Sequence, residues 1–582
     1  MRINRVQITN FRNFKAVDVC FDSHAVILGE NKIGKSNFLY ALRLVLDPSL
    51  SDTARQLREE DFWDPLPRPI TGDHMIVIAI DLTEFDSNED QLALLADHLI
   101  SADPITARLT YVFQPVPQSE KEDDFEFLVY GGDRIENTVS WDVRRRMPLD
   151  VLAALRDAEG DLANWRRSPL RALLQKAESE IGSEDLDRIA EAVSEAREQL
   201  VGLEPIEGLC QQVTNRLVEI MGEHQAIDFL LGFSSTDKNR LIRSLRPLID
   251  EGRRGIAEAS LGSANLIYLA LRSLELEHLV TDGKRDHTFL GIEEPEAHLH
   301  PNLQRMVFRN FFRAREEAGS INVIVTTHSP HIASVAPLRS LIVLRKSEDQ
   351  KSSEAVSTAS LKMDASDVAD LERYLDVTRA EMVFSRGVLL VEGDAERFLV
   401  PRLAELAGYQ LDALGIVVCS VSGTNFLPYI KFLGAGGLQI SYAILTDLDP
   451  AGDGASLGIG RARKLLDHLD IDDPEEEEEL LRIAAEQGIF LNKHTLEVDL
   501  FKCGRHKSMC SALQALASSA PARERAAAWS ANPGTVDSER LLKDINAIGK
   551  GRFAQSLASR ITKNICPPYI LASLSFLADR VR

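Results

Sequence analysis

Near the start of the chain, the apolar and polar positions predict a strand, a loop and a helix in sequence. Residues 3–14 and 17–21 show the alternation of a half-buried strand, and Ala25 to Leu28 form a short apolar run typical of a buried strand. The run FLYALRLVL at 38–46 has apolar side chains at helical spacing. A buried strand that leads through a loop into a helix is typical of an α/β domain.

The pattern then changes twice along the chain. Further strands are predicted over 75–82, 107–113 and 125–130, and 139–145 is expected to continue this antiparallel set. Between about 150 and 255 the sequence is charged, rich in alanine and leucine, and apolar at helical spacing. This block predicts a helical insertion used for packing or dimerisation, although a plain helical subdomain fits the pattern equally well.

Farther along, two apolar runs each end in acidic residues. One leads to Glu392, with Asp394 and Glu396 close behind, and the other leads to Asp447 and Asp449. Side chains two apart on a strand share a face, so both aspartates are expected to point the same way. Carboxylates are the ligands that Mg²⁺ and Mn²⁺ prefer, so these strand ends predict a cation site. Glu396 is the preferred companion of Glu392, whereas Asp394 fits a helix N-cap as well as a ligand.

Composition limits the class of protein. The chain has 582 residues, of which 44% are hydrophobic and 6% aromatic, so it can bury several cores. Its net charge is −23, which does not exclude a local basic groove. Six cysteines without any CxxC pair suggest neither a zinc site nor a disulfide framework, and no apolar stretch is long enough for a membrane span. A cytoplasmic protein with no membrane partner is expected.

The loop after the first buried strand has the spacing of a phosphate-binding loop. GENKIGKSN places Gly29, Gly34, Lys35 and Ser36 in the pattern G-x-x-x-x-G-K-[ST] between a strand and a helix. Glycines let the backbone wrap phosphates, the lysine reaches the β and γ phosphates, and the serine holds Mg²⁺. ATP or GTP is therefore expected to bind here, and the neighbouring Asn31 and Asn37 are included among the candidate nucleotide-binding residues.

Three later segments add chemistry suited to nucleotide hydrolysis. The small-residue loop SLGS, with Ser260, Gly262 and Ser263, precedes a long apolar helix, and by itself it is typical of a helix N-cap. IEEPEAHLHP follows an apolar strand, and INVIVTTHSP is a strand that ends near His328. A carboxylate pair at a strand end can bind the Mg²⁺ sphere and polarise water, and a histidine can reach the γ-phosphate.

Together these four motifs resemble the ABC-type ATPase head of RecF-like and structural-maintenance proteins. The resemblance implies that Glu293 is the Walker B acid, Glu294 the hydrolytic base and His328 the switch histidine. It also implies that the signature-like SLGS loop contacts ATP held by a second head. Glu293 stands where many such ATPases have aspartate, and the SLGS loop lacks their double glycine. Since the chain has one head, a homodimer or tetramer through the head and the helical insertion is expected.

The second half resembles a Toprim domain, in which the first glutamate and the D-x-D pair act at the metal. The resemblance assigns these roles to Glu392, Asp447 and Asp449, with Glu497 as an additional ligand and Asp499 as its alternate. An ATPase head followed by Toprim is the order of the overcoming-lysogenization-defect (OLD) family, which includes the nuclease subunit of Gabija antiphage systems. In that family the segment KGRFA would supply a catalytic lysine, here Lys550.

The predicted architecture is a multidomain α/β protein with an ABC-type head, a helical insertion and a C-terminal Toprim domain. Its expected segments are the first part of the head at 1–150, the insertion at 151–254, the second part of the head at 255–345, a linker with a connecting helix at 346–384 and the Toprim part at 385–582.

The resemblance implies a Mg²⁺- or Mn²⁺-dependent DNA endonuclease acting in antiphage defence, with ATP serving regulation. DNA is the expected partner, and a helicase or reverse-transcriptase element would fit the family. The alternative is a RecF-like ATP-dependent DNA clamp or signalling ATPase whose Toprim domain binds without cutting.

Overall fold

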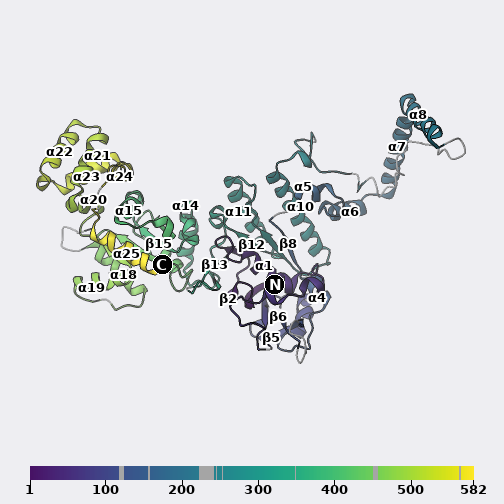
Figure 1. Cartoon of the computed structure of the whole chain (residues 1–582), viewed down its shortest axis with the longest axis horizontal. Coiled ribbons are helices and arrows are strands. Elements are labelled where there is room, and N and C mark those ends of the chain that lie inside the picture. The colour runs from purple at the N-terminus through teal and green to yellow at the C-terminus, as the bar shows by residue number, and fades with distance from the viewer. Residues whose placement is uncertain are drawn as a thin grey trace. The chain divides into compact units, whose positions relative to one another are not determined.

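A computed structural model defines the fold of the chain. It describes residues 1–71, 73–116, 124–154, 157–221, 242–243, 245–251, 253–347, 349–449, 456–472, 474–562 and 565–581. The described residues form two compact units, one of residues 1–152, 289–296 and 301–582 and the other of residues 153–288 and 297–300. Figure 1 shows the elements of both units. No helix in the described part of the chain combines the length and apolar character that crossing a membrane requires.

The ATPase part of the first unit has an antiparallel sheet with the strand order β2-β1-β4-β6-β5, and β7 also pairs with β6. Its strands are β1 (Arg2–Phe11), β2 (Phe14–Cys20), β4 (Ile76–Thr83), β5 (Leu99–Ala102), β6 (Ile105–Pro115) and β7 (Phe125–Gly131).

A second, mostly parallel sheet has the order β14-β13-β3-β12-β11-β8. Helix α1 (Lys35–Leu46) contacts both sheets, and its Phe38 and Leu42 are fully buried in the core that they share. Because β3 and β12 run parallel, their carboxyl ends lie together next to the start of α1. The strands are β3 (Ala25–Leu28), β8 (Leu149–Leu152), β11 (Thr288–Glu293), β12 (Ile321–Thr327), β13 (Leu341–Lys346) and β14 (Ser353–Ser357).

Two predictions for this part were wrong. Residues 139–145 do not continue the strands, because Ser140 accepts a hydrogen bond from the Val143 amide and starts helix α4 (Trp141–Arg146). The start of the predicted linker segment 346–384 is not a linker throughout, since β14 pairs with β13 in antiparallel register at the edge of the sheet. An edge strand has fewer apolar side chains, so its sequence resembles a loop.

The second unit is mainly helical, as the sequence predicts for this block, although residues 155–156, 222–241, 244 and 252 lie outside the described part. Helix α10 contacts α5 and α6, and Lys176 of α6 forms an ion pair of 3.0 Å with Asp282 just after α10. The helices are α5 (Ala158–Ala163), α6 (Leu170–Glu180), α7 (Ser183–Val201), α8 (Glu204–Met221) and α10 (Leu261–Thr281).

The Toprim part of the first unit is built on a parallel sheet with the order β16-β15-β17-β18. The strands are β15 (Gly387–Val391), β16 (Ile416–Ser420), β17 (Ser441–Thr446) and β18 (Ile489–Leu491). The helices that surround this sheet include α15 (Asp394–Ala407), α17 (Leu427–Leu433), α18 (Leu457–His468), α19 (Glu477–Glu486), α20 (Leu496–Leu500), α21 (His506–Leu516), α22 (Ala520–Ala531), α23 (Ser538–Ile548), α24 (Lys550–Ala558) and α25 (Pro568–Val581).

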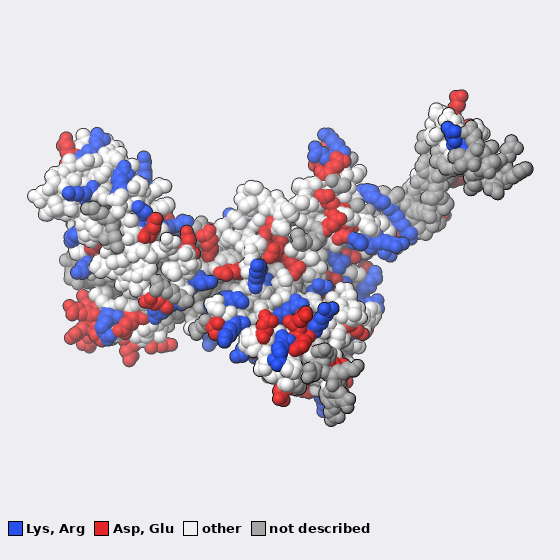
Figure 2. Space-filling model, in the orientation of Figure 1, with Lys and Arg blue, Asp and Glu red and all other residues white. Residues whose placement is uncertain are grey.

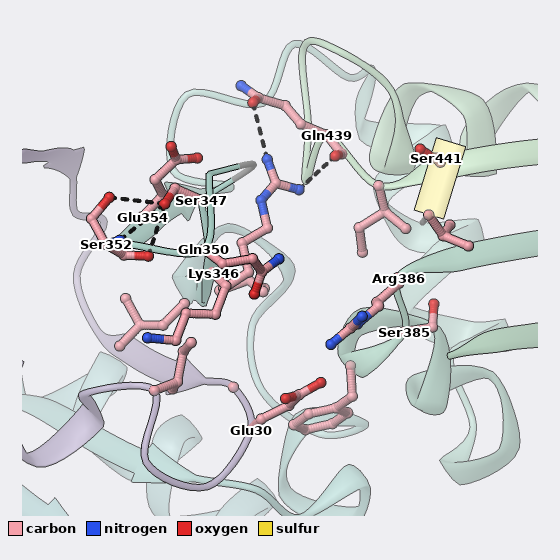
Figure 3. Close-up of a pocket in the computed structure, with 18 of the residues that line it drawn as sticks. Glu30, Lys346, Ser347, Gln350, Ser352, Glu354, Ser385, Arg386, Gln439 and Ser441 are labelled. Carbon is pink, nitrogen blue, oxygen red and sulfur yellow. Dashed lines mark hydrogen bonds between the residues drawn. The ribbon is translucent and has the colours of Figure 1, made fainter. Parts of the chain in front are cut away.

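Within the first unit, a cleft of about 750 Å³ is lined both by residues at the end of β3 and by residues beside β15 and β17. Figure 3 shows Glu30 of the phosphate-binding loop on one side, with Arg386 and Ser441 on the Toprim side. Arg345 of β13 donates hydrogen bonds to the Gln439 carbonyl at 2.5 Å and to its side-chain oxygen at 3.3 Å. These bonds connect a strand beside β3 to the residues just before β17.

Candidate functional site

The phosphate-binding loop folds around a buried lysine. Lys35 is 6% exposed, and its ammonium donates to the carbonyls of Gly29 at 2.9 Å and Glu30 at 3.1 Å. Burial lowers the pKa of Lys35, while the nearby Glu294 and Glu296 act in the opposite direction. Gly34 has φ +112°, and a Cβ there would collide with the Asn13 side chain, so the loop requires glycine at this position.

The other candidate residues of the loop differ in their surroundings. Asn31 and Ser36 are exposed, which leaves them accessible to a phosphate and its metal. Asn37 is held by Arg12, whose Nη1 donates to Asn37 Oδ1 at 2.8 Å, and it donates in turn to Asn13 Oδ1 at 2.7 Å. Asn37 therefore ties α1 to the turn between β1 and β2, a role that its position in the motif did not indicate.

The strand ends next to Lys35 bring the predicted acid and histidine together. Glu294 Oε1 lies 4.0 Å from Lys35 Nζ and 3.5 Å from His328 Nδ1. Glu293 ends β11 and is half-buried. Sequence reasoning missed Glu296, whose Oε1 accepts from Thr327 Oγ1 at 2.7 Å and from the His328 amide at 2.9 Å. Glu296 thus fixes the backbone from which His328 projects, and the only sequence signal was a third glutamate in EEPE.

The signature-like loop belongs to the second unit. Ser260 is the N-cap of α10, and its Oγ accepts from the Ser263 amide at 3.2 Å. A Cβ on Gly262 would lie 2.5 Å from the His298 carbonyl oxygen, so only glycine fits this approach. The structure therefore shows the helix cap that the small residues predict, and contact with a nucleotide on another head stays a prediction.

In the Toprim part, Glu392 follows β15 directly and turns toward the neighbouring strand β17. Its Oε1 accepts from Thr446 Oγ1 at 2.5 Å and from the Asp447 amide at 2.9 Å. Because β15 and β17 are parallel neighbours, their carboxyl ends bring Glu392 and Asp447 together, as the strand-edge argument predicts.

Asp447 and Asp449 do not share a strand face, because β17 already ends at Thr446. Asp447 Oδ1 accepts from Asn492 Nδ2 and, at 3.2 Å, from the Leu496 amide. Asp449 has φ +48°, and its Oδ2 instead lies 3.0 Å from Arg461 Nη2. The period of two therefore does not apply beyond the strand, and the two carboxylates face different partners.

Glu396, Glu497 and Lys550 lie at the same edge. Lys550, the first residue of α24, places its Nζ 3.3 Å from Glu497 Oε1. Glu497 is 2% exposed, and burial raises the pKa of Glu396 to about 7, with Glu497 and Glu392 adding to the effect. Asp447 is affected in the same way, since burial and the carboxylates around it raise its pKa to about 8. The raised pKa values of Glu396 and Asp447 thus reflect both their burial and the carboxylates close to them.

Two residues weighed as alternatives take local roles. Gly393 is the N-cap of α15 and Glu396 Oε2 accepts from its amide at 3.2 Å, so of the two alternatives for Asp394 the helix N-cap is wrong. Asp394 is exposed as the first residue of α15. Asp499 Oδ2 accepts from the Lys493 amide at 2.8 Å, which makes it a cap of the turn before α20. Glu497, and not Asp499, is the residue that meets Lys550.

The donor set suits a divalent cation, although the side chains do not converge on one as they stand. Glu497 Oε2 is buried without a hydrogen-bond partner in the described structure, and Oε1 has the ion pair with Lys550. A buried carboxylate with unused lone pairs among other carboxylates is what Mg²⁺ or Mn²⁺ would bind. Within the described residues no three His, Cys, Asp or Glu side chains are arranged to hold an ion. Arg461 explains part of this, because its guanidinium bridges Glu392 and Asp449.

Sequence reasoning also missed the groups that orient these acids. Asn492 holds Asp447 through Nδ2, and its Oδ1 accepts from the Leu448 amide at 2.9 Å. Asn492 follows the short strand β18, and a lone asparagine after a strand is more typical of a turn. The spatial neighbourhood of β17 and β18 alone reveals its role.

Two features define the class of protein. One is the phosphate-binding loop around Lys35, and the other is the acidic edge, the group of carboxylates beyond the ends of β15 and β17 that consists of Glu392, Glu396, Asp447, Asp449 and Glu497. Together they are typical of a P-loop ATPase joined to a Toprim domain. The model of the AAA ATPase domain family matches residues 1–128 and 150–333. The model described as "Overcoming lysogenization defect protein-like, TOPRIM domain" matches residues 383–449. The chain belongs to the AAA ATPase domain family, and its second half contains an OLD-like Toprim domain.

Proteins with related sequences include two named nucleases. The chain is 24% identical over 504 residues to endonuclease GajA of Bacillus cereus (strain VD045), with 82% of each chain covered. It is 25% identical over 468 residues to the OLD nuclease of Thermus scotoductus, covering 77% of this chain and 82% of the relative. Among solved structures, the C-terminal region of the Burkholderia pseudomallei OLD protein is 45% identical to this chain, with a TM-score of 0.32. The match covers 34% of this chain and 100% of that structure.

Proposed function

We propose that this protein is an ATP-binding, Mg²⁺- or Mn²⁺-dependent DNA endonuclease whose ATPase head regulates its Toprim domain. The observation that supports the proposal most is the meeting of Glu392, Asp447, Glu497 and Lys550 at one edge of a parallel sheet. A module that only binds DNA has no need for buried carboxylates beside a lysine. The names of the related nucleases agree with a phosphodiester-cleaving site.

Each residue has a defined task in this proposal. Bound divalent cations would activate water and stabilise the leaving oxygen. Glu392, Glu396, Asp447, Asp449 and Glu497 are the residues that would hold them. Asn492 orients Asp447, and Lys550, whose ammonium is half-exposed, reaches toward a phosphate while its other side contacts Glu497. The positive charge of Lys550 would offset the charge that develops on the scissile phosphate.

The deciding experiment is plasmid cleavage with and without ATP in Mg²⁺, Mn²⁺ or Ca²⁺. We expect Asp447→Ala to lower nicking by about 100-fold or more, because a lost ligand costs at least as much as a lost supporting group. ATP hydrolysis should be unchanged, since the phosphate-binding loop follows β3, in a different sheet from β17. Asp467→Ala, an exposed aspartate of α18, is the matched control and should cleave normally. Nicking that persists in Asp447→Ala would contradict the assignment, and DNA binding without cleavage by the unmutated protein would favour a clamp.

For regulation we propose a physical route from nucleotide to nuclease. β13 pairs with β3, which leads into the phosphate-binding loop. Arg345 of β13 binds Gln439, which precedes β17, and Asp447 directly follows that strand. A shift of the loop on nucleotide binding can therefore reach the acidic edge through hydrogen-bonded strands. Such a route requires coupling evidence and not only proximity.

Arg345→Ala tests this route. We expect cleavage to lose its response to ATP, while ATP hydrolysis and cleavage each persist. Arg339→Ala, an exposed arginine before the same strand, should keep the response. An unchanged ATP response in Arg345→Ala would show that regulation takes another path.

A role in antiphage defence, with a helicase or reverse-transcriptase element as partner, is the remaining part of the proposal. It predicts that phage plate less efficiently on cells that make the unmutated protein than on cells that make Asp447→Ala. Equal plating would remove the defence role without affecting the nuclease assignment.

A further inference from the structure

An arginine that belongs to no predicted motif contacts the acidic edge. Arg461 lies in the middle of α18, and its side chain is 16% exposed. Its Nη2 is 3.3 Å from Glu392 Oε1 and 3.0 Å from Asp449 Oδ2, and it also donates to the Asp447 carbonyl. One nitrogen of this guanidinium thus touches residues after both β15 and β17.

The charges around Arg461 divide the acidic edge into two parts. Lys550 of α24 pairs with Glu497, whereas Arg461 pairs with Glu392 and Asp449. Because the carboxylates of Glu392 and Asp449 both contact the same nitrogen of Arg461, they would repel each other without a cation between them. Arg461 supplies that cation from within the chain.

The backbone of α18 is anchored where the arginine is needed. The Gly458 amide donates to the Leu448 carbonyl at 2.9 Å, and Ser456 Oγ donates to the same carbonyl. Ser456 also caps the helix through the Ile459 amide at 3.3 Å. The start of the helix is therefore fixed beside Leu448, between the two aspartates.

We propose that Arg461 is a positioning residue that holds Glu392 and Asp449 together in the metal-free centre and competes with the divalent cation for these two carboxylates. This inference rests on the proposed metal-dependent nuclease. A cation that binds Glu392 and Asp449 must then displace the Arg461 guanidinium, which lowers the apparent affinity of the centre for the cation. Half-occupancy of the centre would then require a higher free cation concentration than in a site made of acids alone.

The test measures cation binding directly, by titrating the full-length protein with Mn²⁺ and recording free Mn²⁺ by electron paramagnetic resonance. We expect Arg461→Gln to bind Mn²⁺ about tenfold more tightly or better, because a positive charge within a few ångströms of the ion is removed. The same variant should unfold at a lower temperature than the unmutated protein in EDTA, since its carboxylates repel, and saturating Mn²⁺ should remove that difference. Lys464→Gln removes an equal charge from an exposed position of α18 and should change neither measurement.

The outcomes separate this inference from the proposed function. Unmutated protein that binds no Mn²⁺ would overturn the proposed metal-dependent function itself. Mn²⁺ binding that is unchanged or weaker in Arg461→Gln would overturn the role given to Arg461 while leaving the nuclease intact. Unchanged Mn²⁺ affinity with a higher KM for DNA would instead place Arg461 on the substrate. Arg461→Lys, which retains the charge, should bind Mn²⁺ much as the unmutated protein does.

Discussion

At the scale of single residues, the surroundings of two carboxyl groups at the acidic edge, Glu396 and Asp447, disfavour their ionised forms. Burial is the main cause that raises the pKa of Glu396 to about 7 and that of Asp447 to about 8, and neighbouring carboxylates add to it. Each group therefore binds a proton in the folded protein at pH values where the unfolded chain has already lost it. The contribution of these two groups to folding stability without metal must therefore fall as pH rises from about 4 toward 8.

This sign gives a prediction for Glu396→Gln, which keeps an acceptor for the Gly393 amide but cannot ionise. In EDTA, the melting temperature of the unmutated Toprim part should fall between pH 5 and pH 8, and the variant should show a smaller fall. At pH 8 the variant should be the more stable protein, although it cleaves less DNA. Differential scanning calorimetry across this range checks the slope, with the exposed Glu381→Gln as control. A variant less stable than the unmutated protein at pH 8 would contradict the electrostatic account.

At the scale of elements, helix α18 sits on the segment that holds the aspartates. A Cβ on Gly458 would collide with the Asp447 carbonyl oxygen and lie 2.7 Å from Leu448 Cα, whereas a Cβ on Gly460 meets nothing within 4 Å. The two glycines of one helix therefore differ in what they can tolerate.

We expect Gly458→Ala to displace the start of α18 and to cost about 1–3 kcal/mol, as overpacking does. DNA cleavage should fall, because the added Cβ displaces the segment 447–449, which carries the proposed ligands Asp447 and Asp449. Gly460→Ala should instead gain about 0.5–1 kcal/mol from better helix propensity and cleave normally. Urea unfolding and plasmid nicking of both variants measure the contrast, and equal behaviour of the two would refute it.

The elements also show what the sequence could and could not reveal. Strand ends with carboxylates were visible because buried strands are short apolar runs, so Glu392 and Asp447 could be placed at a common edge. Segment 139–145 was assigned to a strand because it follows a set of predicted antiparallel strands, whereas the Ser140 cap starts a helix there. Arg461 and Asn492 were missed because their roles depend on which strands and helices lie side by side, and local pattern does not contain that information.

At the scale of the whole molecule, charge is distributed unevenly. Figure 2 shows acidic side chains gathered over α19, whose first turn contains Glu477, Glu478 and Glu479. DNA is repelled by such a surface, so it should approach the acidic edge from the side of Lys550 and not across α19.

Separate strands position the nucleotide and the nuclease chemistry, so the two can be removed separately. Lys35→Ala should abolish ATP binding, because it removes the ammonium that the carbonyls of Gly29 and Glu30 hold in the loop and that a P-loop uses to bind the β and γ phosphates. Metal-dependent nicking in the absence of ATP should survive. Fluorescent-nucleotide binding and plasmid nicking on the same preparation provide the check, and loss of both would show that the head must be intact for any cleavage.

The residues of the acidic edge are far apart in the sequence, and this spacing has a consequence for biosynthesis. The ATPase sheets are complete once β14 has been made, but the Toprim edge combines Glu392 with Glu497 and with Lys550 of α24. A ribosome must therefore synthesise the ATPase part and most of the Toprim part before the last of these groups exists. Nascent and prematurely terminated chains lack the lysine, so under the proposed function the nuclease centre is complete only in a chain whose ATPase part has already been made.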